Sequence, residues 1–123
     1  MEMSGNLKYQ KQLTFSEITV QITELGEDYH IMLRGGDKPH IGCTVLAVPR
    51  PSLTGDGSIA VTSSVLNVTG HKDEQLCRYL AEEIARKKRA VVVCTGGFHY
   101  DNISSAQIQE VLAAVREICE NII

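Results

Sequence analysis

Residues 90–97 read AVVVCTGG, a continuous apolar run that ends in two glycines. A short apolar run bounded by glycine, without polar alternation, is typical of a fully buried strand. Sequence with helical periodicity lies on both sides of the run, so this strand should connect two helices. We therefore expect residues 90–95 to form the central strand of a sheet.

Two helices are predicted beside this strand. Before it, apolar residues recur at helical spacing and predict a helix from about Lys72 to Lys87. After it, Ser104 and Gln107 have the spacing of a capping box, which predicts that a second helix begins there. The expected buried positions are Leu76, Cys77, Leu80 and Ile84 in the first helix, and Ile108, Val111, Leu112, Val115 and Ile118 in the second.

Four further strands are expected before the first helix. Apolar and polar residues alternate over 15–23 and again over 29–34, and the turn between them favours an antiparallel hairpin. A third strand is expected over His40–Val48, which is rich in apolar and β-branched residues. It should end there because the prolines that follow cannot donate to a sheet ladder. A fourth is expected over Ile59–Val68.

The order ββββ-α-β-α predicts an α+β fold, in which a mostly antiparallel sheet carries both helices on one face. The other face would then need cover, which a second copy of the chain could supply. A chain of 123 residues has room for one core, so we expect a single domain over residues 13–123. Residues 1–12 are polar and lack periodicity, which favours a flexible lead-in.

Charge and cysteine content narrow the class of protein. The net charge of −3 gives no basic face for nucleic acid, and no apolar run is long enough to span a bilayer. The four cysteines lie among apolar residues without a CxxC pair, and no signal peptide is recognisable. We expect a cytoplasmic protein with free thiols and with neither nucleic acid nor a membrane as its partner.

Three loops contain the candidate functional residues: PSLTGDG at 51–57, TGHKD at 69–73 and GGFHYDN at 96–102. The glycines and hydroxyls of PSLTGDG could cradle an anion, or the loop could be an ordinary Asp-Gly turn. TGHKD precedes a helix, where unpaired N–H groups suit a phosphate or carboxylate and Lys72 adds charge. In the alternative, Thr69 or Asp73 only caps that helix and His71 is solvated.

GGFHYDN follows the buried strand, where ligands of α/β folds gather. Gly96 and Gly97 would permit close approach of a ligand, Phe98 or Tyr100 could stack on a flat ring, and the neighbouring His99 and Asp101 could form hydrogen bonds. The alternative is a simple strand-to-helix turn.

Metal and enzyme chemistry have less support in the sequence. The possible metal ligands have no recognised spacing such as HExxH, and no GxSxG elbow, Walker loop or dinucleotide fingerprint is present. Cys94 lies in an apolar strand, where a thiol is inert. We therefore expect no catalytic residue and no metal. The possible ligands considered are His40, His71, His99, Asp56 and Asp101.

The strings VPRPSLTGDG (48–57), SSVLNVTGHKD (63–73) and GFHYDNI (97–103) resemble the LpdD-like family of small proteins associated with gallate decarboxylases of the UbiD type. This resemblance implies a chaperone that carries reduced prenylated flavin mononucleotide (FMN) to a UbiD-type decarboxylase. It also implies a fold similar to that of proteasome assembly chaperones, and a homodimer.

The sequence and the resemblance together lead to one functional prediction. We expect a non-catalytic carrier of reduced prenylated FMN for a UbiD-type aromatic acid decarboxylase. The alternatives are a small metal-dependent hydrolase that uses His40, His71 and His99, and a decarboxylase assembly subunit that binds no small molecule. The predicted cofactor-binding residues are Arg50, Ser52, Thr54, Gly55, Asp56, Thr69, Gly70, His71, Lys72, Gly97, His99 and Asp101.

Overall fold

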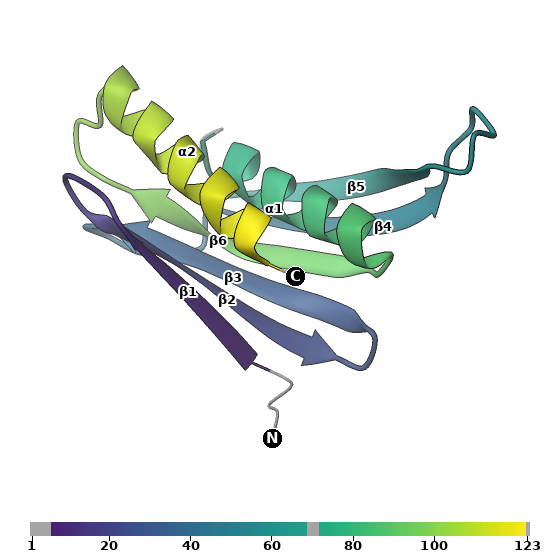
Figure 1. The fold of residues 1–123 in the computed structure, drawn as a ribbon. Helices are drawn as coiled ribbons and strands as arrows, with labels where there is room; N and C mark the ends of the chain where they lie inside the picture. Colours follow the sequence, from purple (N-terminus) through teal and green to yellow (C-terminus); the bar gives the residue numbers. More distant parts are fainter. Residues whose placement is uncertain (1–5, 69–71, 123) are drawn as a thin grey trace.

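The structure, a computed structural model, describes residues 6–68 and 72–122. Six strands form one sheet in the order β1-β2-β3-β6-β4-β5, and helices α1 and α2 lie together over one of its faces (Figure 1). The predicted α+β class and the shared helix face are thereby confirmed. The strands are β1 (Asn6–Gln12), β2 (Glu17–Leu25), β3 (Asp28–Gly36), β4 (Cys43–Pro51), β5 (Ile59–Asn67) and β6 (Val92–His99), and the helices are α1 (Lys72–Lys88) and α2 (Ser105–Asn121).

Strand β6 contains most of the apolar run at residues 90–97, and it lies in the middle of the sheet as predicted. It pairs in parallel with β3 and antiparallel with β4, whereas the other neighbouring strands are antiparallel. Because β3 and β6 run the same way, they end at the same edge of the sheet, with Gly36 opposite His99. The candidate site lies at that shared edge.

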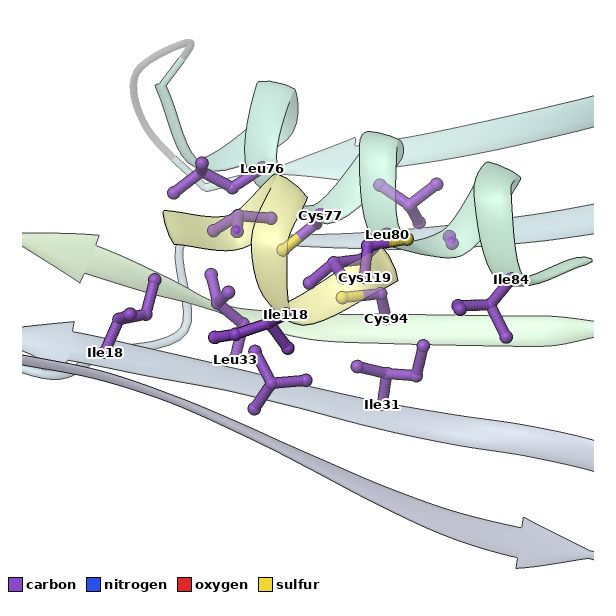
Figure 2. Packing of buried hydrophobic residues seen from close by; sticks show 14 of the residues in the cluster. Ile18, Ile31, Leu33, Leu76, Cys77, Leu80, Ile84, Cys94, Ile118 and Cys119 are labelled. Atoms are coloured by element: carbon purple, nitrogen blue, oxygen red, sulfur yellow. The ribbon is translucent and has the colours of Figure 1, made fainter. Parts of the chain in front are cut away.

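The core lies between the sheet and the two helices. Leu80 and Ile84 of α1 and Ile31 and Leu33 of β3 have no exposed surface (Figure 2). The predicted apolar stripes are confirmed, although Ile108 and Leu112 are only partly buried. All four cysteines are free and buried, and burial raises the pKa of the Cys119 thiol to about 11. They therefore act as core side chains.

The predicted capping box at the start of α2 is present. The Ser104 hydroxyl accepts a hydrogen bond from the Gln107 amide at 3.1 Å, and the Gln107 side chain accepts one from the Ser104 amide at 2.8 Å. Two of the donors that a helix start leaves without partners are thereby satisfied.

Strand β1 corrects one expectation, because residues 6–12 pair along β2 from Asn6 opposite Thr23 to Gln12 opposite Glu17. They form an edge strand instead of a flexible lead-in. The sequence of β1 shows little alternation of apolar and polar residues because most of its side chains remain exposed. Backbone pairing with β2 stabilises the strand instead. Lys11 also pairs with Glu117 of α2 at 2.8 Å.

Strands β4 and β6 both end later in the sequence than expected, at Pro51 and His99. Pro49 and Pro51 lie inside β4, opposite Val61 and Ile59, at a point where β4 has passed the end of its pairing with β6 at Ala47. The Ser52 amide donates to the Ser58 carbonyl at 3.0 Å, so it points toward the partner strand. Successive amides of a strand point to opposite sides, and the nitrogens of Pro49 and Pro51 therefore point toward the free edge of β4. A proline there loses no ladder hydrogen bond.

Glycine does not end β6, which continues through Gly96 and Gly97 to His99. A Cβ added to Gly96 would lie 1.8 Å from the Leu33 carbonyl oxygen. The glycine therefore allows β3 and β6 to come together at this point.

Candidate functional site

The structure separates two of the predicted loops, PSLTGDG and GGFHYDN. Cys43 of β4 lies opposite Gly96 of β6, and β4 then runs in the other direction to Pro51, about 27 Å away at about 3.4 Å per residue. The hairpin loop 52–58 therefore lies at the far end of the sheet from His99 (Figure 1). One surface on a single chain cannot contain both loops.

Polar groups of the hairpin loop are used within the loop itself. The Asp56 carboxylate accepts hydrogen bonds from the Ser58 amide and hydroxyl at 3.0 and 2.6 Å, and the bond from Ser58 lowers the Asp56 pKa. The Thr54 amide donates to the Ser52 hydroxyl at 3.3 Å, and Arg50 donates to the Thr62 hydroxyl at 2.9 Å. These contacts favour the ordinary turn over the anion cradle.

Glycines 55 and 57 both have positive φ, as this turn requires. A ligand-binding role for Arg50, Ser52, Thr54, Gly55 and Asp56 stays a prediction.

Asp73 organises the opposite end of the sheet. It lies in the first turn of α1, and its side chain is only 8% exposed. One carboxylate oxygen accepts a hydrogen bond from the Phe98 amide at 2.9 Å, and the other lies 3.0 Å from His40 Nε2. A Cβ added to Gly97 would lie 2.9 Å from that second oxygen. Gly97 thus makes room for Asp73.

His40 is held from both sides of its ring. Nδ1 lies 3.2 Å from the Lys38 carbonyl oxygen, and Nε2 faces Asp73. Both ring nitrogens of His40 therefore face oxygen atoms of the protein. The ring packs edge to face against His99, with centroids 6.0 Å apart.

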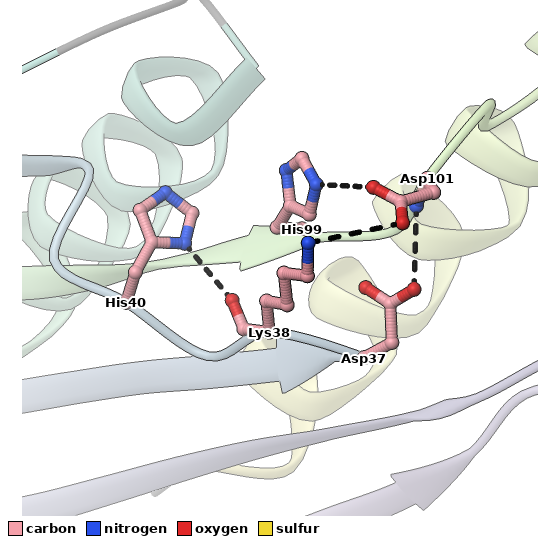
Figure 3. Close-up of polar contacts among 5 residues, drawn as sticks. All are labelled: Asp37, Lys38, His40, His99 and Asp101. Atoms are coloured by element: carbon pink, nitrogen blue, oxygen red, sulfur yellow. Dashed lines mark hydrogen bonds and ion pairs between the residues drawn. The ribbon is translucent and has the colours of Figure 1, made fainter.

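His99 and Asp101 form a second polar group at the same edge (Figure 3). His99 Nε2 lies 2.9 Å from Asp101 Oδ1, and Lys38 Nζ lies 3.9 Å from Asp101 Oδ2. The hydrogen bond from His99, aided by the charge of Lys38, lowers the pKa of the Asp101 carboxyl. The Asp101 amide in turn faces Asp37 Oδ2 at 3.4 Å.

We call the polar residues that meet where β3 and β6 end the β3–β6 edge cluster. Sequence reasoning predicted His99 and Asp101 as binding residues, with Gly97 beside them, and it considered His40 and Asp73 in other roles. It missed Asp37 and Lys38, which belong to a segment, GGDKP, that only marked a break in the chain. Parallel pairing of β3 with β6 brings them in. The cluster comprises Asp37, Lys38, His40, Asp73, His99 and Asp101.

The remaining predicted residues are only partly described. Lys72 begins α1, whereas Thr69, Gly70 and His71 lie outside the described residues. Phe98 is 4% exposed and packs against Phe15, so it is not available to stack on a ligand. The Tyr100 ring also packs against Phe15, at 4.7 Å between centroids.

Two hollows border the edge cluster. An apolar cavity between α1 and α2, beside Phe98, has a volume of about 10 Å³, the room of about one water molecule. On the open face of the sheet, a polar hollow of about 330 Å³ reaches the volume of a small-molecule site. It is lined by Gln12, Ser16, Glu17, Thr19, Arg34, Gly35, Gly36 and Pro39.

Known proteins support the fold and the family to different degrees. No curated protein matches the chain. A solved structure described as a novel chaperone complex for yeast 20S proteasome assembly matches 93% of this chain and 98% of its own, at 15% identity and a TM-score of 0.51. That likeness shows the fold, and it agrees with the resemblance to proteasome assembly chaperones.

A family model identifies the chain more closely. The model of the prenylated flavin chaperone LpdD-like domain matches residues 13–123, which is most of the sequence. The chain therefore belongs to the LpdD-like family of prenylated flavin chaperones.

Proposed function

We propose that this protein binds reduced prenylated FMN and carries it to a UbiD-type aromatic acid decarboxylase without catalysing a reaction itself. The observation that carries the proposal is the family match over residues 13–123. The family is one of chaperones, and this agrees with the four buried, free cysteines, which leave no accessible thiol nucleophile among them.

The polar hollow on the open face is the best candidate for the flavin. Its volume is at the lower end of the range for small-molecule sites, which is enough for part of the flavin, and Arg34 lines it beside the end of β3. Arg34 already donates to the Gln21 side chain, which fixes its position. A guanidinium suits the flavin phosphate because it can donate two parallel hydrogen bonds. Lys38, whose side chain is 70% exposed, is close enough in sequence to add charge.

The proposed carrier is a cytoplasmic homodimer. No helix within residues 6–68 and 72–122 is long and apolar enough to cross a membrane. On the face of β4 and β5 that points away from the helices, Leu46, Val48 and Leu66 are 39%, 40% and 75% exposed. A second copy that covers this apolar strip is the occupant we propose, because apolar side chains gain stability when they leave water.

An anaerobic titration tests the binding step. The purified protein is titrated with reduced prenylated FMN, and binding is followed by the flavin absorbance and fluorescence. We expect tight binding of this form and clearly weaker binding of oxidised FMN. Absence of binding, or equal affinity for oxidised FMN, would contradict the proposal. Copurification with a decarboxylase in the absence of flavin binding would point to the assembly-subunit alternative.

Two matched arginine variants locate the site. Arg34→Gln should weaken binding by about tenfold or more, as expected for a lost charge-assisted contact to phosphate. Arg50→Gln removes the same charge at the opposite end of the sheet and should leave affinity unchanged. The reverse result would instead place the flavin at the hairpin loop that the sequence suggested.

A further inference from the structure

We propose that Asp37, His99 and Asp101 bind a divalent metal ion of the Mn²⁺ type at the edge where β3 and β6 end. Each residue offers one ligand atom, and the three atoms lie within 4.8 Å of one another. His99 Nε2 and Asp101 Oδ1 are 2.9 Å apart. Two neighbouring ligands of an octahedral ion with bonds of about 2.1 Å lie about 3.0 Å apart, so this pair already has the required spacing.

The backbone holds two of the three ligands in place. The amides of Asp37 and Lys38 both face the His99 carbonyl oxygen, at 2.8 and 3.5 Å. Gly36 has a φ of +87°, and a Cβ there would lie 1.9 Å from that same oxygen. Only glycine allows the end of β3 to approach β6 so closely. Asp37 and His99 are therefore positioned side by side before any ion arrives.

The charges at this edge favour a cation. Two carboxylates and one imidazole meet here, and the Lys38 nitrogen lies 3.9 Å from Asp101 Oδ2, at the limit of an ion pair. The Lys38 side chain is 70% exposed and can swing into solvent when an ion takes its place. The carboxylate of Asp37 accepts only a long contact, 3.4 Å, from the Asp101 amide.

The ligand types suit a divalent first-row metal ion, of which Mn²⁺ is the one tested here. Carboxylate oxygens suit Mg²⁺, Ca²⁺ and Mn²⁺, whereas an imidazole nitrogen suits first-row transition metals, and Mn²⁺ accepts both. His40 is not part of the set, because its ring nitrogens face Asp73 and the Lys38 carbonyl and not the carboxylates of Asp37 and Asp101. Three protein ligands leave further coordination positions open to water or to an anionic ligand.

A Mn²⁺ titration followed by electron paramagnetic resonance tests this proposal without any flavin, so its outcome is independent of the proposed function. The wild-type protein should remove one equivalent of the free Mn²⁺ signal. Asp37→Asn and Asp101→Asn should each weaken binding by at least about tenfold, since loss of even an outer-shell partner costs that much. Both side chains are exposed at the surface, and circular dichroism confirms that the variants are folded.

The matched control is Asp56→Asn, which removes the same charge at the opposite end of the sheet. It should bind Mn²⁺ as the wild type does. The proposal is overturned if the wild type binds no Mn²⁺ at millimolar concentrations. It is also overturned if all three variants bind alike, because binding would then reflect net charge alone.

Nuclear magnetic resonance adds the location. Bound Mn²⁺ should broaden the His99 ring signals beyond detection and broaden those of His30 far less. His30 lies opposite Val93, six residues before His99 in β6 and thus about 20 Å away. Equal broadening of both rings would place the ion elsewhere and refute the assignment.

Discussion

Asp73 shows how one buried carboxylate can organise a site. It accepts the Phe98 amide of β6 and faces His40 of the β3–β4 connection, so it joins α1, β6 and a loop at a single point. From the sequence, a helix cap was the only role considered for Asp73 itself, because its two partners are 25 and 33 residues away. Partners of that kind depend on the assembled sheet.

Replacement of Asp73 by Ala should destabilise the fold. The Phe98 amide would lose its acceptor while buried, at a cost of about 1–3 kcal/mol in the free energy of unfolding. Urea unfolding followed by circular dichroism measures it. Asp73→Asn keeps an acceptor oxygen for the amide and should lose less. If both substitutions cost the same, the charge toward His40 matters more than the bond to Phe98.

The titration of Asp101 follows from its two partners. His99 and Lys38 lower its pKa below the ordinary value of 3.8, so folding favours the ionised form. The resulting stabilisation is present above the ordinary pKa and is lost as the pH falls through the lowered one. A carboxyl carbon NMR titration should give a midpoint below 3.8, and Lys38→Gln should move that midpoint upward. An unchanged midpoint in Lys38→Gln would show that the lysine does not act on Asp101.

At the scale of elements, the sequence predicted the structures that depend on neighbouring residues and missed those that depend on pairing between distant strands. The α1 and α2 stripes and the capping box at Ser104 depend on residues within a few positions, and all are present. Strand β1 and the proline-containing end of β4 are stabilised by backbone pairing with β2 and β5, which side-chain patterns do not encode. The parallel pairing of β3 with β6 could not be predicted from the sequence for the same reason, and neither could the place of Asp37 beside His99.

The close approach of β3 and β6 can be tested with two glycines of the same backbone type. Gly36 and Gly55 both have positive φ, but only Gly36 has a backbone atom near its absent Cβ, at 1.9 Å. Gly55→Ala should cost about 1–2 kcal/mol through backbone strain alone. Gly36→Ala should cost more than about 4 kcal/mol, or prevent folding. Similar losses in urea unfolding for the two variants would show that β3 can shift away from β6.

At the scale of the whole molecule, the two ends of the sheet carry different features. The edge cluster and the polar hollow lie at one end, and the hairpin loop 52–58 extends from the other. The open face carries polar residues over β2 and β3 but an apolar strip over β4 and β5. In the proposed dimer, this division would leave the hollow accessible while the second copy covers the strip.

The proposed dimer can be tested at Leu66, which is 75% exposed on the open face. Leu66→Lys would place a charge in the interface and should convert a dimer into a monomer in light-scattering measurements after gel filtration. Leu53→Lys is the control, because Leu53 is 91% exposed in the hairpin loop. A wild-type monomer, or a Leu66→Lys dimer as stable as the wild type, would contradict this interface.

Transfer of the cofactor tests the central claim most directly. The protein is loaded anaerobically with one equivalent of reduced prenylated FMN, freed of excess ligand and mixed with the apoprotein of a UbiD-type decarboxylase, and decarboxylation is measured after oxidation. We predict that activity appears in proportion to the loaded protein and exceeds that obtained with the same amount of free reduced cofactor, and that the unloaded protein gives none. Activity no greater than with free cofactor would show that the protein does not deliver the flavin.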